Sequence, residues 1–274
     1  MSERVQKVLS QWGIASRRKA EKMILAGRIQ INGQTANLGD KVDLTTDTLQ
    51  VDGKKIERSD RPQFIYLLLN KPTAVVSTCS DPQNRPTVID LLSPNLQQGK
   101  GIHPVGRLDF ASSGALILTN DGKLTLGLTH PRYHLPKTYR VELDRPPAQK
   151  DLAAWRRGII LEGRKTLTAK LKLIKGDKSG KTIEIILTEG RNRQIRRVAE
   201  LLGYQVKKLH RTAIGSIALN TSGCDNLPPG KYRHLQTTEI NFLKNSFNNQ
   251  PLKVAARSGS AVYDRQKIHP RPKK

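Results

Sequence analysis

The sequence predicts an α+β protein in which strands outnumber helices. Several apolar runs have the length of strands, whereas few segments repeat apolar residues at helical spacing. These runs do not alternate regularly with helices, as they would in a doubly wound parallel sheet. A helix-rich opening segment precedes them. We therefore expect a small first domain followed by a larger one.

Residues 1–58 form the expected first domain, with two helices and short strands. Apolar residues recur at helical spacing in two places: Val5, Val8, Leu9 and Trp12, then Ala20, Met23 and Ile24. Ser16 is a candidate N-cap for the second helix. Gly13 and Gly27 are positioned to end the two helices. Asn32-Gly33 is a strong hairpin signal.

A polar linker at residues 59–63 leads into the second expected domain, residues 64–243. Its strand-like runs are residues 64–69, 115–118, 139–143 and 183–187. Residues 244–274 are expected to be a basic, disordered tail. The last 28 residues hold seven basic side chains against one acidic side chain and lack a periodic apolar face.

The charge of the chain points to a polyanionic partner. Lys and Arg number 48 and Asp and Glu 23, giving a formal net charge of +25. Nucleic acid is the simplest partner for such a chain. An anionic membrane is the alternative, but it calls for a basic amphipathic helix or an apolar anchor, and neither is found in the sequence.

The chain is expected to be cytoplasmic and free of metal. No apolar run approaches the roughly 20 residues that span a bilayer, and residues 1–7 lack a signal-peptide core. Cys79 and Cys224 fit a reducing compartment and form no disulfide framework. The scattered histidines and these isolated cysteines do not predict a metal site.

Arg17, Arg18 and Lys19 lie in the first turn of the second expected helix. The helix dipole disfavours cations there, so three together suggest phosphate binding. A solvated charged face is the alternative. The segments SRRKAE at 16–21 and GRIQING at 27–33 resemble an S4 domain, a small RNA-binding module. This resemblance implies binding of structured RNA, with the basic helix face on the phosphates.

Asp109 belongs to the most informative stretch, GRLDFASSGALILTNDG at 106–122. A strand is expected to end near Leu108, and a polar turn follows before the apolar strand at 115–118. Charged side chains at such points are common in active sites. Aspartate is also an ordinary turn residue, and the stretch taken alone favours that structural role.

Four ordered motifs change this weighting. They are NKP at 70–72 with VVST at 75–78, the stretch at 106–122, KTYRV at 137–141, and EGRNRQIRR at 189–197. Together they resemble the ribosomal RNA pseudouridine synthases of the RsuA and RluB type. Ala74 stands where that family more usually has glycine. The resemblance implies a larger domain with a mixed, mainly antiparallel sheet.

The resemblance also implies the roles of individual residues. Asp109 is the expected catalytic carboxylate, Tyr139 stacks on the target base, and Arg196 pairs with Asp109. The alternative for Tyr139 is a structural role in the core, and the alternative for Arg196 is attraction of RNA without a catalytic role. The expected RNA-binding residues are Arg17, Arg18, Lys19, Lys71, Arg107, Arg191, Arg193 and Arg197.

The implied reaction is an isomerisation, which requires no cofactor or metal. Asp109 can attack C1′ as a nucleophile or remove a sugar proton to give a glycal, and the sequence leaves both routes open. The expected partner is ribosomal RNA or a pre-ribosomal particle, with 23S RNA favoured over 16S RNA, and a monomer is expected. The rival hypotheses are a non-catalytic RNA-binding or ribosome-assembly factor and an N-glycosylase.

Overall fold

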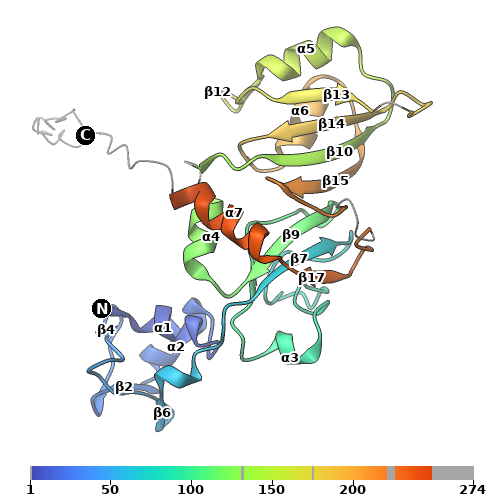
Figure 1. Ribbon diagram of the computed structural model, residues 1–274. Helices are drawn as coiled ribbons and strands as arrows, with labels where there is room; N and C mark the ends of the chain where they lie inside the picture. Colours follow the sequence, from blue (N-terminus) through green and yellow to red (C-terminus); the bar gives the residue numbers. More distant parts are fainter. Residues whose placement is uncertain (1, 131–132, 175, 221–225, 249–274) are drawn as a thin grey trace, which may run out of the picture.

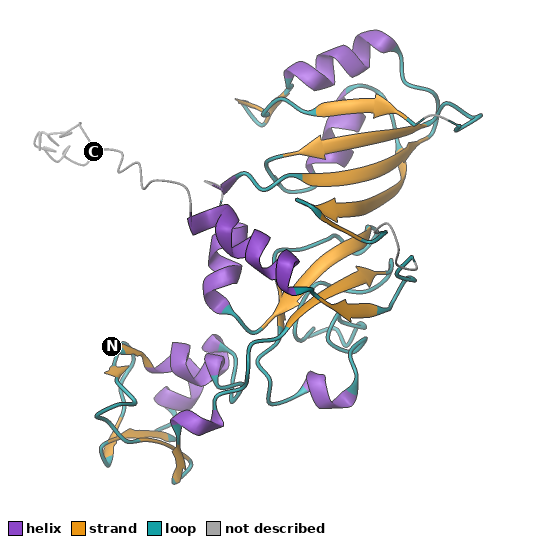
Figure 2. Ribbon diagram, in the orientation of Figure 1, coloured by secondary structure: helices purple, strands orange, loops and turns teal. Residues whose placement is uncertain are grey.

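The computed structural model describes residues 2–130, 133–174, 176–220 and 226–248 (Figures 1 and 2). Cys224 and residues 249–274 lie outside this range, so the expectations for them are not addressed by the structure. Cys79 is a free thiol. No described helix combines the length and the hydropathy needed to cross a membrane.

The opening segment folds around a core of its own. Its elements are β1 (Glu3–Arg4), α1 (Val5–Gln11), α2 (Arg17–Leu25), β2 (Ile29–Ile31), β3 (Gln34–Thr35), β4 (Lys41–Val42), β5 (Leu49–Val51) and β6 (Lys54–Ile56). The apolar faces of both helices pack with Ile29 and Leu49. The oxygen Oγ of Ser16 accepts the Lys19 amide at 3.3 Å, which confirms the N-cap. The expected turn after β2 is also confirmed, since β2 pairs with β3 across it.

The segment after β6 includes residues 59–63, which were expected to form a linker. It contains a short 3₁₀ helix, η1 (Arg58–Asp60). The guanidinium carbon of Arg61 then lies 5.2 Å from the ring centroid of Trp12 and 5.0 Å from that of Phe64. One cation thus stacks on rings from both sides of the linker. The domain limits at residues 58 and 64 stay predictions.

The rest of the chain is built on one nine-stranded sheet. Its strands are β7 (Tyr66–Lys71), β8 (His103–Pro104), β9 (Ser113–Thr119), β10 (Lys137–Leu143), β13 (Lys170–Leu173), β14 (Thr182–Leu187), β15 (Val206–Ile214), β16 (Ile217–Ala218) and β17 (Tyr232–His234). The main path runs β13-β14-β10-β15-β9-β7-β17. Among the described strand pairs of this sheet, β15 with β9 is parallel and the others are antiparallel. The mixed, mainly antiparallel sheet is therefore confirmed.

Helices cover the sheet and short elements fill its connections. These are α3 (Pro94–Gln97), α4 (Gly122–Thr129), α5 (Gln149–Arg157), α6 (Gln194–Leu201) and α7 (Thr237–Asn248), with a separate hairpin of β11 (Ile160–Leu161) and β12 (Arg164–Lys165). In Figures 1 and 2, α4 and α7 lie beside the β7–β9 half, and α5 and α6 lie beside the β10–β14 half.

The β7–β9 half is buried on both faces because its strands are continuously apolar. Leu68 and Ile117 belong to a cluster with α4 and α7, whereas Leu67 and Leu116 belong to a cluster on the opposite face. Successive strand residues therefore enter different cores, as the two-residue period of a strand requires. The expected strands at 64–69 and 115–118 are confirmed in β7 and β9.

The limit expected at residue 244 lies inside a helix. Helix α7 runs to residue 248, Leu243 is fully buried, and Phe247 packs with the α4 cluster. A Cβ added to Gly127 of α4 would lie 2.6 Å from Cγ of Phe247. The apolar residues of this last helix are spaced to face α4, and their burial explains why the chain remains ordered there.

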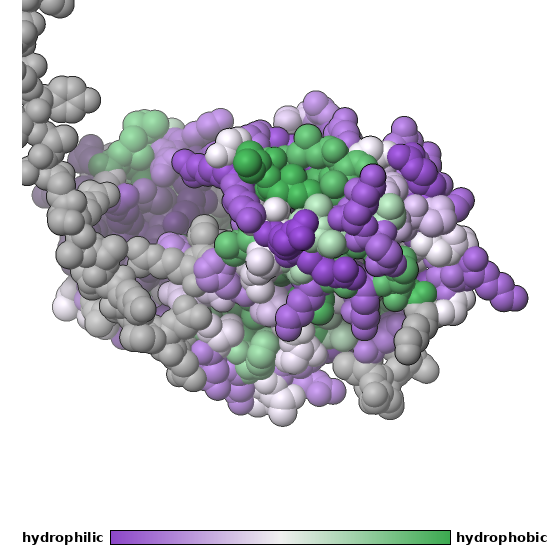
Figure 3. Space-filling model, turned by 90° about the horizontal axis from the view of Figure 1, so that it is seen from above, coloured by the Kyte–Doolittle hydropathy of each residue, from purple (hydrophilic) through white to green (hydrophobic). Residues whose placement is uncertain are grey.

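The outer surface is mostly hydrophilic at the end that carries α5. Figure 3 shows this face, where hydrophilic side chains surround a hydrophobic area. The exposed large apolar side chains in this part of the chain include Ile160, Leu167 and Leu173.

Candidate active site

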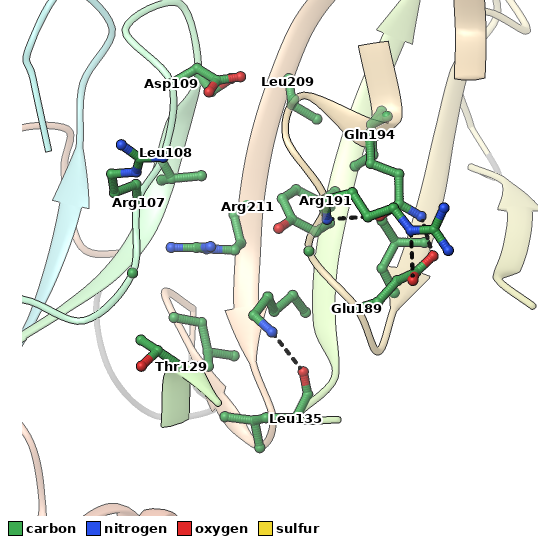
Figure 4. A pocket seen from close by; sticks show the side chains of 18 of the residues that line it. Arg107, Leu108, Asp109, Thr129, Leu135, Glu189, Arg191, Gln194, Leu209 and Arg211 are labelled. Carbon is green, nitrogen blue, oxygen red and sulfur yellow. Dashed lines mark hydrogen bonds and ion pairs between the residues drawn. The ribbon is translucent and has the colours of Figure 1, made fainter. Parts of the chain in front are cut away.

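A cavity of about 230 Å³ opens where the two halves of the sheet meet. Asp109 lies on one side of it, Glu189, Arg191 and Gln194 lie on the other, and Arg211 projects from the strand between them (Figure 4). The junction is the parallel pairing of β15 with β9. A Cβ at Gly114 would lie 2.1 Å from the carbonyl oxygen of Arg211, so glycine is required for the strands to approach.

Asp109 is on the loop between β8 and β9. The expected strand ending near Leu108 is wrong, because β8 already ends at Pro104. Hydrogen bonds fix this loop instead: the Ser77 hydroxyl contacts both the amide and the carbonyl of Leu108, and the Ser112 amide donates to the Asp109 carbonyl. The Asp109 side chain remains 35% exposed at the cavity. These hydrogen bonds fix the main chain of the loop and leave the Asp109 carboxylate accessible from the cavity.

Lys71, an expected RNA-binding residue, does not lie on the surface. It is fully buried at the end of β7. Its ammonium donates to the carbonyls of Ser112 at 2.9 Å, Pro72 at 2.9 Å and Asp109 at 3.3 Å. Burial, opposed by the charge of Asp109, lowers the pKa of Lys71 to about 8. This cation lies beneath the carboxylate loop and has no access to a phosphate.

Arg193, rather than Arg196, makes the ion pair with Asp109. Its Nη1 lies 3.7 Å from Oδ2 of the carboxylate. Arg193 is the N-cap of α6, with a φ of 47° that turns the chain into the helix. Its side chain is half exposed, so it can contact both the carboxylate and an incoming RNA.

Arg196 supports the loop from below. Its Nη2 donates to the Ala111 carbonyl at 2.9 Å, and its Nη1 donates to the Val206 carbonyl at 3.1 Å. Burial lowers the pKa of this guanidinium, and the charge of Asp109 opposes that shift. Arg196 is therefore near Asp109 but bonded to main-chain oxygens. The expected pairing of Arg196 with Asp109 is not among the described ion pairs, in which Arg193 holds that place.

Tyr139 lines the cavity from β10 and is partly buried. It packs against apolar clusters from both halves of the sheet. Its register partner on β15 is Arg211. The ring therefore lies at the junction of the two halves and lines the same cavity as Asp109.

The other expected RNA-binding arginines differ in the contacts they make within the protein. Arg107 is exposed and lines the cavity. Arg191 donates to Glu189 and to the carbonyls of Arg164 and Lys165, so it ties α6 to the β11–β12 hairpin. Arg197 pairs with Glu162 at 2.7 Å. Arg191 and Arg197 thus have structural contacts of their own.

The three basic residues of α2 are exposed: Arg17, Arg18 and Lys19. Arg17 lines a second, larger cavity of about 850 Å³ between the opening segment and α4. Thr129 lines both this cavity and the one that holds Asp109. The two cavities therefore adjoin at Thr129, with Asp109 in one and Arg17 of the basic helix in the other.

Lys137 and Arg211 line the Asp109 cavity and were not expected there. Lys137 lies in the quoted KTYRV motif, two residues before Tyr139, which places both side chains on one face of β10. Arg211 carries no comparable signal, because its position depends on the long-range pairing of β15 with β9. No cluster of three or more metal-binding side chains is found among the described residues.

Comparisons with known proteins identify relatives for both parts of the chain. Residues 65–201 match the family model "RNA pseudouridylate synthase", and residues 3–49 match the model "S4 domain". A solved structure described as "Crystal structure of pseudouridylate synthase" superposes with a TM-score of 0.62 at 31% identity. That superposition covers 88% of this chain and 99% of the other.

Curated relatives match over most of their length. "Ribosomal large subunit pseudouridine synthase B" of Bacillus subtilis (strain 168) is 40% identical over 85% of this chain and 96% of that protein. The protein of the same name from Salmonella typhimurium (strain LT2) is 36% identical over 89% of this chain and 83% of its own.

Proposed function

The chain belongs to the RNA pseudouridylate synthase family, of the RsuA and RluB type with an N-terminal S4 domain, and is an RNA pseudouridine synthase; we propose that Asp109 is its catalytic carboxylate and that its substrate is a uridine of large-subunit ribosomal RNA. The substrate follows the names of relatives that are 34–40% identical. The choice of carboxylate rests on the cavity.

One observation carries the assignment of Asp109. Of the cavity-lining residues, Asp109 and Glu189 are the two carboxylates. Both oxygens of Glu189 are occupied: Oε1 accepts from the Leu167 amide and Gln194, and Oε2 accepts from Arg191. Asp109 has only the 3.7 Å contact with Arg193 among the described ion pairs. Its oxygens remain available for a substrate.

The reaction requires one carboxylate with the target uridine held beside it. In the nucleophilic route, an Asp109 oxygen bonds to C1′ as the N1–C1′ pair leaves with uracil. In the glycal route, Asp109 removes the 2′ proton and the C1′–C2′ double bond forms as uracil leaves. Uracil then turns and bonds through C5, which loses its proton. As C5 bonds to C1′, the Asp109–C1′ bond breaks in the nucleophilic route, and Asp109 returns the proton to C2′ in the glycal route. Both routes thus regenerate the carboxylate and remain open.

Tyr139 is proposed to stack on the target base. A base in a helix or loop must leave its stack to reach Asp109. Stacking on an aromatic ring contributes roughly 1–3 kcal/mol per base. The partly buried ring of Tyr139 lines the same cavity as Asp109, which supports this role. Arg196 is proposed to maintain that loop.

RNA binding is proposed to use the two cavities that adjoin at Thr129. Arg107 and Arg193 lie at the Asp109 end, and Arg17 lies at the α2 end. The remaining α2 cations, Arg18 and Lys19, extend the same basic turn. RNA entering the pocket would meet these cations through its phosphates. We further propose a monomer that acts on ribosomal RNA or a pre-ribosomal particle in the cytoplasm.

Chemical mapping of ribosomal RNA tests the substrate. Carbodiimide treatment marks pseudouridine as a stop to reverse transcription. In cells lacking the protein, one stop in large-subunit RNA should vanish, and the wild-type gene should restore it. Loss of a stop from small-subunit RNA would overturn the proposed substrate. An abasic site in RNA treated with the purified protein would instead favour an N-glycosylase.

The rival of a non-catalytic assembly factor is tested by the same cells. They should regain the stop with the wild-type gene and not with Asp109→Asn. Restoration by both genes would favour the rival, because a binding factor does not need this carboxylate.

A further inference from the structure

The departing uracil must be stabilised as an anion, and this follows from the proposed function. In either route the N1–C1′ electron pair moves onto the base. Its negative charge spreads over the carbonyl oxygens O2 and O4. Asp109 carries no positive charge in either route and therefore cannot offset that charge. A site for this reaction therefore needs donors or cations along the base edge.

Two cations flank Tyr139 on the wall of the cavity. Arg211 is its register partner on β15, and directly paired strand residues have Cβ atoms about 5 Å apart. Lys137 lies two residues earlier on β10, and all three side chains line the cavity. A base stacked on Tyr139 therefore has Arg211 and Lys137 within reach of its edge.

Both cations have donors to spare. Nε of Arg211 donates to the Ala115 carbonyl at 2.6 Å, while Nη2 is buried without a hydrogen-bond partner among the described residues. The Lys137 ammonium makes one hydrogen bond, to the Leu135 carbonyl at 3.1 Å (the dashed line at Leu135 in Figure 4). No described ion pair includes either residue.

Burial makes the charges of these cations costly. Arg211 is only 4% exposed, and a buried donor without a partner loses the hydrogen bonds that water would give it. Burial and the neighbouring Arg211 lower the pKa of Lys137 to about 8. An anion or a carbonyl oxygen in the cavity would relieve both costs.

We propose that Lys137 and Arg211 bind the carbonyl oxygens of the uracil stacked on Tyr139 and stabilise its negative charge when the N1–C1′ bond breaks. The two residues interact more strongly with the anion than with neutral uracil, so they lower the barrier. They also favour the C4 carbonyl of uracil over the C4 amino group of cytosine. That amino group donates a hydrogen bond, and the side chains of Lys137 and Arg211 have no acceptor for it.

The test compares a poor and a good leaving group under single-turnover conditions. Large-subunit RNA transcripts are made with uridine or with 5-fluorouridine, and loss of the parent nucleoside at the target is followed after digestion. Fluorine at C5 withdraws charge from the anion and reduces its need for cations. Lys137→Met should slow the uridine transcript about 100-fold, as loss of one anion-stabilising donor does elsewhere. On the fluorinated transcript, the factor by which this substitution lowers the rate should be at least ten times smaller.

Controls separate this role from folding and phosphate binding. Lys137→Arg should recover most of the rate, and Lys170→Met, an exposed lysine of β13, should match wild type. Arg211→Lys provides a second variant with the same expected dependence on fluorine. Equal slowing of both transcripts, or a raised Kd with an unchanged rate, would overturn the proposal.

Two outcomes separate a failure of the anion-stabilising role from a failure of the proposed function. If wild type fails to isomerise the transcript, the proposed substrate is wrong. If wild type is active, Asp109→Asn is inactive and Lys137→Met slows both transcripts equally, only the anion-stabilising role fails.

Discussion

Lys71 donates its ammonium protons to the main-chain carbonyl of Asp109, and to those of Pro72 and Ser112. A fully buried cation therefore joins the end of β7 to both sides of the turn that presents the carboxylate. The contact leaves the Asp109 side chain free. It positions the loop without occupying the oxygens that the reaction needs.

Lys71→Met should impair catalysis without weakening RNA binding. The change leaves three buried carbonyls without their shared donor, at a cost of about 1–3 kcal/mol of stability. We expect at least a tenfold loss of kcat and a Tm lower by several degrees, with an unchanged Kd. Single-turnover kinetics, calorimetry and RNA titration measure these. The exposed Lys170→Met serves as control. A Kd raised in proportion to the lost activity would restore the direct RNA role.

Ala74→Gly should stabilise the protein. Ala74 has a φ of 61°, a left-handed conformation that costs a non-glycine residue roughly 1–2 kcal/mol. Glycine removes that strain but adds freedom to the unfolded chain, so a net gain of about 0.5–1 kcal/mol is expected. Urea unfolding measures it. Ala154→Gly, inside helix α5, should lose about 1 kcal/mol instead. A loss at both positions would refute the strain argument.

Gly101→Ala should loosen the docking of the S4 domain. A Cβ at Gly101 would lie 2.9 Å from the Ser10 carbonyl oxygen, whereas at Gly99 it would meet nothing within 4 Å. Both glycines have a φ of 67°, so Gly99→Ala is a control with the same backbone strain. The Gly101 variant should show a larger radius of gyration in small-angle X-ray scattering and weaker RNA binding. Identical scattering from the two variants would contradict a docking role for this contact.

The rate of the wild-type enzyme should fall as pH rises through about 8. Burial, with Arg211, lowers the pKa of Lys137 to about 8. Below that value the ammonium carries its charge, and above it the charge is lost. Lys71 has a pKa of about 8 as well, so both groups titrate together. Lys137→Arg should move the fall to higher pH. A profile unchanged by this substitution would assign the fall to Lys71.

Local signals predicted the elements well. The place of Ser16 ahead of the apolar helical positions was sufficient to place an N-cap, and Asn32-Gly33 was sufficient to place a hairpin. The family resemblance placed Asp109 and Tyr139, and both line the same cavity. In these cases the determining contacts lie within a few residues or within one quoted motif.

Contacts between strands that are distant in the sequence could not be predicted from it. Lys71 resembled a phosphate-binding lysine, and its burial arises because β7 pairs with β9. The exchange of Arg193 for Arg196 follows from a left-handed N-cap that turns Arg193 toward the carboxylate. Arg211 enters the cavity only through the parallel junction of β15 with β9. No periodicity or motif encodes these pairings.

Tritium release from RNA labelled at uridine C5 tests the role of Asp109 most directly, because isomerisation must expel that hydrogen. Asp109→Asn retains the size of the side chain and removes its charge. We predict no release above background from this variant, with RNA affinity within about twofold of wild type. Asp90→Asn, a carboxylate that does not line the cavity, should release tritium at the wild-type level if it folds. Release by Asp109→Asn at the wild-type rate would contradict the assignment.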